Sequence, residues 1–328
     1  MQKIRTRFAP SPTGYLHIGG LRTALFSYLW AKKNKGEFII RIEDTDRARL
    51  IANADQELID TLAKLGINSD VAIKHQSDRL ALYQKASDKL IDNNNAYRCF
   101  CSPERLDEMR TKQQKNKQVP KYDRHCLNLS KEEIDKKIVA GQKFVVRFKI
   151  PDNEIIVGQD AVYGKISIKG QDLDDFVILK SNKFPTYHLA SVVDDHDMRI
   201  SHVIRGEEWM PSLPKHILIY EALKYALPTF VHLPLLLNPD KSKLSKRQGD
   251  VAVEDYLKKG YLIEALLNYV ALLGWNPGNN KEFFMLDDLI KEFSLEKINK
   301  AGAVFDVTKL NWFNAEYIRK IIIQNDKR

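Results

Sequence analysis

Cysteine is scarce in this sequence, with three in 328 residues. Three thiols cannot close a disulfide framework, which excludes the small disulfide-rich secreted class and favours a reducing compartment. No uninterrupted apolar run approaches the roughly 20 residues that a membrane-spanning helix needs. The first residues also lack the apolar block of a signal peptide. We therefore expect a cytoplasmic protein that makes no use of a membrane.

An acidic surplus is also absent. Lysine and arginine number 52 against 43 aspartate and glutamate residues, which gives a net charge of +9 and a pI near 9.2. A basic balance favours polyanionic partners such as nucleic acid, but a surplus of this size can equally serve solubility alone. The net charge alone therefore does not indicate nucleic-acid binding, and a sequence motif is needed to support it. The length predicts two or three domains.

The N-terminal part alternates strands with helices. Residues 3–9 are typical of a strand, and a helix with leucine at every fourth position (Leu21, Leu25, Leu29) follows. Residues 37–42 predict the next strand, and a second amphipathic helix ends near Gly66. This alternation predicts a doubly wound parallel α/β sheet, in which ligands lie beyond the carboxyl ends of the strands. The loops at 10–20 and 43–47 are therefore candidates for the site.

The texture changes from about residue 99 to 170, where a basic, glutamine-rich stretch precedes short β-type runs at 144–150, 155–157 and 166–168. An α/β pattern resumes at 176–180, and a helical pattern follows the lysine-rich loop at 241–247. We interpret this order as a sheet interrupted by an inserted domain. The predicted division is a first catalytic half, an insertion, a second catalytic half and a helical domain, at residues 1–98, 99–175, 176–238 and 239–328.

Two short motifs carry phosphate chemistry. His17-Ile18-Gly19-Gly20 opens the first helix, where free backbone amides and the helix dipole favour an anion and glycine permits close approach. Alone, such a histidine is more often a helix cap. Lys243-Leu244-Ser245-Lys246-Arg247 forms a cationic loop that could neutralise charge on a leaving pyrophosphate. Alone, it is more often a solvated basic turn.

Together and in this order, the two motifs resemble the paired HIGH and KMSKS signatures of class I aminoacyl-tRNA synthetases. The run Ala9-Pro10-Ser11-Pro12 is similar to that of bacterial glutamyl-tRNA synthetases, whereas glutaminyl and eukaryotic-type enzymes carry a different first turn. The resemblance implies a Rossmann-type sheet split by a tRNA acceptor-binding domain, followed by a helical stem-contact domain, in a glutamate–tRNA ligase. The longer stretches that carry it are residues 7–20, 41–46, 185–190, 192–198 and 203–209.

The resemblance also implies a glutamate pocket. Arginine pairs bidentately with carboxylates, so we expect Arg205 to bind the side-chain carboxylate and reject glutamine, with Arg7 as a second cation and Glu43 for the ammonium. Relatives can carry asparagine at the position of Ser191, which leaves that contact open. Without the family match, each lone arginine or glutamate would be interpreted as a surface ion pair. The expected glutamate-binding residues are Arg7, Ser11, Glu43, Tyr187, Ser191 and Arg205.

For ATP, which would carry Mg²⁺, the resemblance implies that His17 holds phosphates and that Gly19 lies against adenine. We expect His17, Lys243 and Lys246 to be catalytic, because transfer here depends on positioning and charge neutralisation rather than on a general base. The expected ATP-binding residues are His17, Gly19, Gly20, Glu208, Trp209, Leu236, Lys243 and Lys246. The family commonly requires bound tRNA before it activates glutamate.

All three cysteines lie between residues 99 and 126, with a spacing compatible with one structural zinc ion. Relatives with zinc can use a histidine two positions beyond the last cysteine, but Asn128 stands there, and Tyr122 and His125 are imperfect substitutes. Three buried free thiols are the alternative. The expected ligands are Cys99, Cys101, Tyr122 and Cys126.

The expected partners are tRNA(Glu), L-glutamate and ATP, with a monomeric enzyme, and the basic run at 112–121 fits phosphate contacts. Three alternatives stay open: a glutamyl-queuosine tRNA(Asp) synthetase, a metabolic nucleotidyltransferase without RNA, and an inactive RNA-binding paralogue. A full-length bacterial enzyme would continue into an anticodon-binding domain about where this chain stops. We therefore expect either a fragment or a natural short form.

Overall fold

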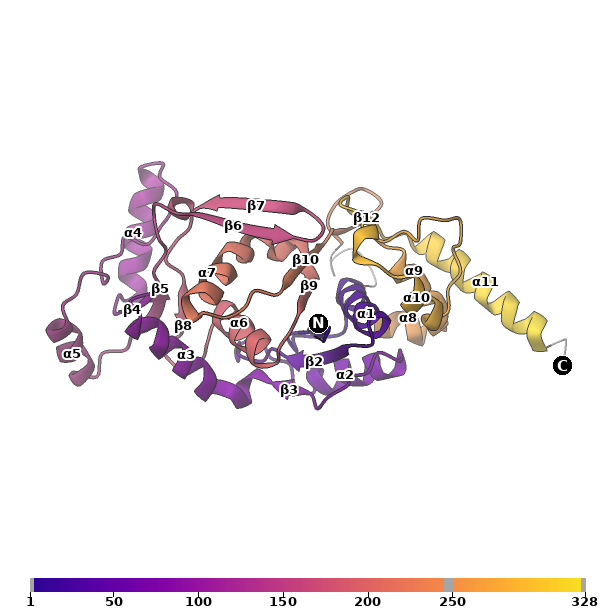
Figure 1. The fold of residues 1–328 in the computed structure, drawn as a ribbon, viewed down its shortest axis with the longest axis horizontal. Coiled ribbons are helices and arrows are strands. Elements are labelled where there is room, and N and C mark those ends of the chain that lie inside the picture. The colour runs from indigo at the N-terminus through magenta and orange to yellow at the C-terminus, as the bar shows by residue number, and fades with distance from the viewer. Residues whose placement is uncertain (1–2, 245–250, 326–328) are drawn as a thin grey trace.

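The main sheet of the computed structural model has seven strands in the order β3-β2-β1-β9-β10-β6-β7 (Figure 1). The structure describes residues 3–244 and 251–325. All neighbouring strands pair in parallel except β7, which is antiparallel to β6. The strands are β1 (Arg5–Phe8), β2 (Glu37–Ile42), β3 (Lys74–His75), β6 (Ile155–Asp160), β7 (Gly164–Lys169), β9 (His202–Gly206) and β10 (Thr229–Leu233).

Helices cover both faces of this sheet, which confirms the predicted doubly wound fold. Successive residues of a strand point to opposite faces. Ile40 accordingly packs in the cluster that contains Leu25, whereas Ile39 packs in the cluster that contains Leu189 and Ile217. The first face is covered by α1 (Ile18–Lys33) and α2 (Ala54–Lys64), and the second by α3 (Leu80–Asp92), α6 (Tyr187–Asp197) and α7 (Leu213–Leu223).

The strand order reverses between β1 and β9. From β1 the chain adds β2 and β3 on one side, and after a long intervening segment it returns to add β9 and β10 on the other. At such a switch point the connections leave in opposite directions and open a crevice beyond the carboxyl ends of the strands. Arg7, near the end of β1, and Arg205, near the end of β9, lie at this crevice.

The intervening segment builds a second, antiparallel sheet of three strands, in the order β4-β5-β8. Two helices without buried residues accompany it and begin at the serine caps Ser102 and Ser130. These elements are β4 (Ala96–Cys99), β5 (Val145–Phe148), β8 (Val177–Leu179), α4 (Pro103–Lys115) and α5 (Lys131–Val139).

The sheets do not follow the proposed insertion limits strand by strand. The β6–β7 hairpin falls within residues 99–175, yet β6 pairs with β10 of the main sheet. Conversely, β8 lies in the range assigned to the second catalytic half, yet it pairs with β5 of the small sheet. Strand propensity is local, whereas the choice of neighbour depends on distant residues. The division into domains therefore stays a prediction.

The C-terminal part is mostly helical. Leu266 and Tyr269 of the predicted apolar face are buried against α1 and α11, and α11 projects from the end of the molecule opposite α4 and α5 (Figure 1). The elements are β11 (Leu236–Leu237), α8 (Val253–Lys258), α9 (Ile263–Ala271), α10 (Leu286–Glu292), β12 (Ala303–Val304) and α11 (Val307–Asn325). Short 3₁₀ helices occur at η1 (Gln76–Arg79), η2 (Gly170–Asp172), η3 (Glu207–Ser212) and η4 (Leu295–Lys297).

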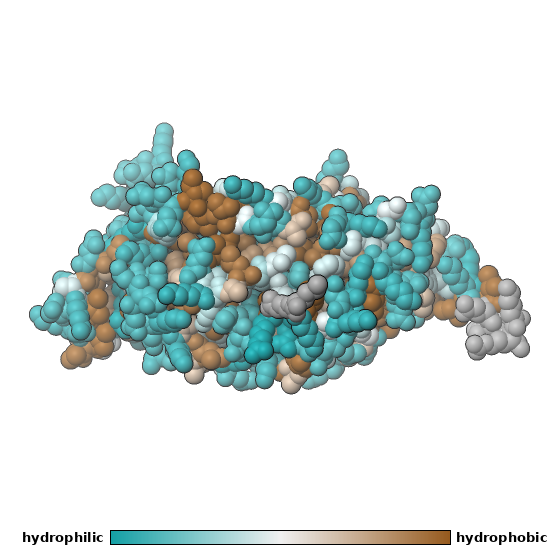
Figure 2. Space-filling model, viewed as in Figure 1, coloured by the Kyte–Doolittle hydropathy of each residue, from teal (hydrophilic) through white to brown (hydrophobic). Residues whose placement is uncertain are grey.

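Hydrophilic residues cover most of the face shown in Figure 2. Among residues 3–244 and 251–325, no helix combines the length and the apolar character that crossing a bilayer requires.

Gly36 is a test of the packing between β1 and β2. A Cβ atom at this position would lie 2.2 Å from the carbonyl oxygen of Ile4, which also accepts the hydrogen bond from the amide of Glu37. Because that oxygen belongs to the backbone, it cannot swing away. We expect Gly36→Ala to lower the free energy of unfolding by about 3 kcal/mol in urea titrations.

Gly141→Ala is the matched control. Gly141 has a φ of +70° but nothing within 4 Å of an added Cβ, so only the backbone strain of about 1 kcal/mol applies. Equal losses in the two variants would contradict a steric role for Gly36.

Candidate active site

A cavity of about 590 Å³ lies at the switch point, between the ends of β1, β2 and β9 and the start of α6. Most of the residues expected to bind glutamate meet there. The exception is Ser191, which lies one turn after Tyr187 on α6, is buried, and has no hydrogen-bond partner for its Oγ among the described residues. The expected residues that line the cavity are Arg7, Ser11, Glu43, Tyr187 and Arg205.

Asp195 holds two buried arginines, of which Arg7 lines the cavity. Its carboxylate accepts hydrogen bonds from Arg7 Nε at 3.0 Å and from Arg41 Nη1 at 2.7 Å. Burial alone would raise the pKa of Asp195, but the two guanidinium groups together lower it below the usual value. Arg7 is thus oriented by a fixed negative charge.

Arg41 also determines the environment of Glu43. Its Nη2 donates to Glu43 Oε1 at 3.2 Å, and its side chain is fully buried. Burial raises the pKa of Glu43, while Arg41 and Arg7 oppose the rise. Arg41 and Asp195 stand inside stretches that carried the family resemblance, but the sequence analysis gave them no role. The mostly apolar run at 189–193, followed directly by Asp194 and Asp195, is the sequence feature that could have indicated buried carboxylates.

Arg7, Arg41, Glu43 and Asp195 form a buried charge cluster, and Asp194 links this cluster to η1 and α3. Its carboxylate accepts hydrogen bonds from Gln76 Nε2, Arg79 Nε and the Tyr83 hydroxyl, each at 2.8 Å. Arg41 Nε lies 3.6 Å from it. Buried charges are retained only where such partners satisfy them. The cluster therefore ties α6 to β2, η1 and α3 directly beneath the cavity.

Arg205 is held by neutral groups. Its Nε donates to His232 Nε2 at 3.0 Å, and its Nη1 donates to the Tyr187 hydroxyl at 3.0 Å and lies 3.2 Å from His216 Nδ1. Burial lowers the pKa of both His216 and His232, so both rings are neutral near pH 7. Nη2 of Arg205 is buried and has no hydrogen-bond partner among the described residues.

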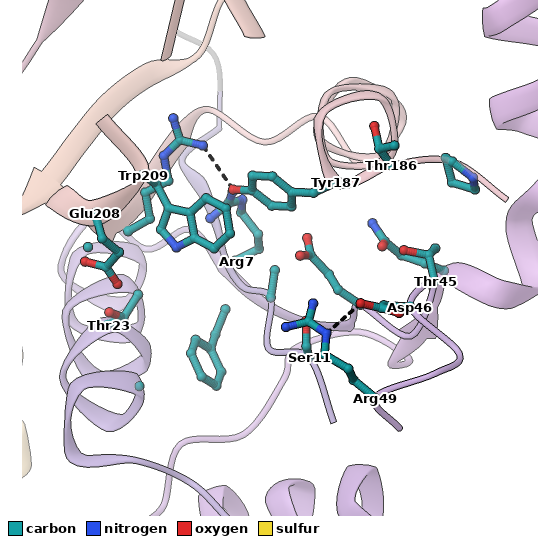
Figure 3. Close-up of a pocket in the computed structure, with 18 of the residues that line it drawn as sticks. Arg7, Ser11, Thr23, Thr45, Asp46, Arg49, Thr186, Tyr187, Glu208 and Trp209 are labelled. Carbon is teal, nitrogen blue, oxygen red and sulfur yellow. Dashed lines mark hydrogen bonds and ion pairs between the residues drawn. The ribbon is translucent and has the colours of Figure 1, made fainter. Parts of the chain in front are cut away.

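Aromatic rings form one wall of the cavity (Figure 3). The ring of Tyr187 packs on Trp209 with centroids 4.3 Å apart. Across the cavity, Ser11 lies near the Asp46–Arg49 ion pair, which measures 2.6 Å. Trp209, expected beside the nucleoside, thus borders this larger cavity. An apolar wall with a few polar groups at fixed positions is typical of small-molecule sites.

A smaller cavity of about 290 Å³ adjoins the first and shares Gly19, Gly20 and Glu208 with it. His17 caps α1 there, and its Nδ1 accepts the amide hydrogen of Gly19 at 2.9 Å, so the proton of the neutral ring is on Nε2. Six of the residues expected to bind ATP line this cavity; Lys246 lies outside the described residues. The six are His17, Gly19, Gly20, Glu208, Leu236 and Lys243.

The segment that follows the second motif pairs with the backbone at the start of the first motif. The amide of Ile18 donates to the carbonyl of Val251 at 2.9 Å, and the amide of Val253 donates to the carbonyl of Leu16 at 2.8 Å. Lys243 lies on a turn that pairs back onto Leu237. Distant parts of the sequence thus border one cavity of about 290 Å³ at a helix N-terminus, where an anion is favoured.

Comparison with known proteins identifies this arrangement. Residues 3–312 match the family described as tRNA synthetases class I (E and Q), catalytic domain. The chain is 50% identical over 335 aligned positions to a glutamate–tRNA ligase of Alkaliphilus metalliredigens, covering 98% of this chain and 68% of the relative. It is 53% identical to one of Prosthecochloris aestuarii, covering 97% and 66%. The chain thus spans about two thirds of the length of these relatives.

A solved structure agrees. The crystal structure of a glutamate–tRNA ligase from Elizabethkingia meningosepticum in complex with its amino acid matches with a TM-score of 0.93 at 41% identity, over 97% of this chain and 70% of that one. The chain belongs to the class I tRNA synthetases of the glutamate and glutamine type. The resemblance inferred from the motifs and the predicted Rossmann-type fold of a class I synthetase are both confirmed.

The three thiols of this synthetase gather at the end of β4 in the small sheet. The sulfur atoms of Cys99, Cys101 and Cys126 lie within 4.8 Å of one another. The Tyr122 hydroxyl lies 3.2 Å from the sulfur of Cys99 and 3.3 Å from that of Cys101. His125, the other substitute considered, is exposed and does not belong to the cluster. The residues brought together are therefore the expected set with Tyr122.

Arg41 provides a test of the charge cluster in the synthetase. Removal of its guanidinium would leave the carboxylates of Glu43, Asp194 and Asp195 buried together with one fewer cation. We expect Arg41→Met to lower the free energy of unfolding by about 3–5 kcal/mol in urea titrations.

Arg110→Met is the control, since its ion pair with Asp107 is exposed and its loss should change stability by less than about 0.5 kcal/mol. If Arg41→Met lowered the free energy of unfolding by less than about 1 kcal/mol, as expected for an exposed ion pair, Arg41 would not be the cation that balances the buried carboxylates.

Proposed function

We propose that this chain catalyses the two half-reactions of a glutamate–tRNA ligase. In the first, the α-carboxylate of L-glutamate attacks the α-phosphorus of ATP, and pyrophosphate leaves to give glutamyl-adenylate. In the second, a hydroxyl of the 3′-terminal ribose of tRNA(Glu) attacks the carbonyl carbon of the adenylate, and AMP leaves. Both steps depend on positioning and on neutralised charge.

The observation that carries this proposal is the junction of the two cavities. The larger holds a buried arginine whose Nη2 has no partner among the described residues, and the smaller is bordered by a helix N-terminus and Lys243. They share Gly19, Gly20 and Glu208. A carboxylate ligand in the first would therefore meet a nucleotide in the second at their common wall.

On the glutamate side, the fixed partners of each group suggest its role. Arg205 presents Nη2 to the side-chain carboxylate, and a carboxamide would place an N–H against that N–H. Glu43 receives the ammonium group. Arg7, already paired with Asp195, acts mainly as a local positive charge.

On the ATP side, His17 Nε2–H and the first turn of α1 hold phosphate oxygens, while Lys243 follows the departing pyrophosphate. Lys246 is proposed for the same role from the motif alone. Mg²⁺ bound to ATP would supply further neutralisation of the phosphates. Leu236 and Gly19, which both line the smaller cavity, border the base.

The acceptor end of tRNA would reach this junction from the small sheet. Lys180, which follows β8, lines the larger cavity and donates from Nζ to the carbonyl of Thr45 at 3.0 Å. No residue of α4 or α5 is buried, so their basic side chains are available to phosphates. This supports the predicted acceptor-binding role of the region.

Exchange of pyrophosphate into ATP tests the function. We expect exchange that requires both glutamate and total bacterial tRNA, with none on glutamine. Arg205→Ala should reduce kcat/KM for glutamate by at least about 100-fold, because a buried charge pair with the ligand is lost.

Lys3→Ala removes an exposed lysine that lines neither cavity and lies outside α4 and α5, so it should leave exchange unchanged. Glutamate-dependent exchange without tRNA would instead favour the queuosine-modifying alternative, and equal exchange on glutamine would contradict the role of Arg205.

We also propose that the thiol cluster holds a structural zinc ion. Three sulfur atoms within 4.8 Å of one another and a hydroxyl 3.2–3.3 Å from two of them fit one tetrahedral site. Hydrogen bonds from Cys126, Tyr122 and Arg147 lower the pKa of the Cys99 thiol, whereas the contact with Cys99 and burial raise the pKa of the Cys126 thiol. Arg105 Nη1 also lies 3.4 Å from Cys101 Sγ, so cations are present to balance thiolates.

Tyr122→Phe tests the fourth ligand. The variant keeps the ring on which Arg147 stacks at 4.0 Å but lacks the oxygen. We expect about one zinc ion per chain in the parent by elemental analysis and an affinity at least about tenfold lower in the variant, by competition with a chromophoric chelator.

His125→Ala is the control and should bind zinc like the parent, because His125 is outside the cluster. A parent without zinc would favour the three free thiols.

A further inference from the structure

Arg205 differs from the other buried arginines at the site. Arg7 and Arg41 each form ion pairs with aspartate, whereas no carboxylate of the described residues lies within ion-pair distance of Arg205. Its three hydrogen-bond partners among the described residues are a tyrosine hydroxyl and two neutral imidazoles. A guanidinium that is oriented but not neutralised keeps its full charge for a ligand.

The hydrogen-bond chemistry fixes the tautomer of His232. Nε of Arg205 always carries a hydrogen, so His232 Nε2, 3.0 Å away, must accept. Burial lowers the pKa of His232, and the hydrogen of the neutral ring must therefore be on Nδ1. That atom lies 2.7 Å from Asp160 Oδ2, which accepts it.

Asp160 is itself fixed. Its Oδ1 accepts the amide hydrogens of Val162 and Tyr163, both at 2.9 Å, at the turn between β6 and β7. Its Oδ2 also accepts the amide hydrogen of His232 at 3.1 Å. Asp160 is 1% exposed and His232 is fully buried, so water does not compete for these bonds.

We propose that Asp160 and His232 are positioning residues for the specificity arginine. Asp160 selects the tautomer of His232, and His232 Nε2 then orients Arg205 while a neutral ring separates the two opposite charges. A carboxylate in direct contact with Arg205 would hold it equally well but would compete with the substrate carboxylate. The β6–β7 hairpin thus helps the pocket to distinguish glutamate from glutamine.

This inference rests on the proposed function and is tested on binding alone, without tRNA. The probes are the non-hydrolysable sulfamoyl analogues of glutamyl-adenylate and glutaminyl-adenylate, measured by calorimetry on the full chain. His232→Asn can retain a donor towards Asp160 but loses the acceptor for Arg205. His232→Gln can retain that acceptor and loses the donor.

We expect His232→Asn to weaken the glutamyl analogue about tenfold, since a hydrogen bond to a charged group is lost, and the glutaminyl analogue less than about twofold. His232→Gln should recover most of the glutamyl affinity. Asp160→Asn should behave like His232→Asn, because its amide would donate to Nδ1 and move the ring hydrogen to Nε2, against Arg205. Nitrogen NMR of labelled histidine should report the Nδ1–H tautomer of His232 in the parent and its loss in Asp160→Asn.

His202 provides the matched control, since it lies on the same strand as Arg205 and contacts Ser201 and Trp30 rather than the pocket. His202→Asn and His202→Gln should bind both analogues like the parent. Equal affinities of the Asn and Gln variants at His232, or an equal loss for both analogues, would overturn the inference. A parent that prefers neither analogue would instead contradict the proposed function.

Discussion

Compensation of buried positive charge is the constraint on which the rest of this structure depends. Arg7, Arg41 and Arg205 are the last residues but one of β1, β2 and β9, and each side chain is nearly or fully buried. Two of them share Asp195, so their charges are balanced within the protein. Arg205 is held by His232, His216 and Tyr187 instead. This difference separates the two structural arginines from the ligand-binding one. A guanidinium without a partner carboxylate is stabilised more strongly by a bound carboxylate than one that is already paired.

The doubly wound topology supplies the partners. Asp194 and Asp195 stand on α6, which follows the small sheet in the sequence, yet they reach residues of β1 and β2 that precede it. The switch point between β1 and β9 places the two halves of the parallel sheet edge to edge. A pocket for a ligand with charges at both ends can therefore be assembled from segments almost two hundred residues apart.

The small sheet and the helical part border the same crevice. Lys180 connects β8 to the loop after β2 through Thr45, and residues 251–253 pair with the turn before α1. Contacts from two distant regions of the chain therefore help to shape the two cavities.

Local patterns determined much of this protein: the leucines of α1 and the two signature motifs need only neighbouring residues to be recognised. Arg7, Glu43, Tyr187 and Arg205 could be assigned to one pocket because they stand inside such motifs, and the structure brings them together. The pairing of β6 with β10, the burial of Ser191, and the contacts of Asp160 with His232 had no such signal. These features were decided only by the tertiary structure, because the choice of neighbouring strand and of buried hydrogen-bond partner is made between residues far apart in the chain.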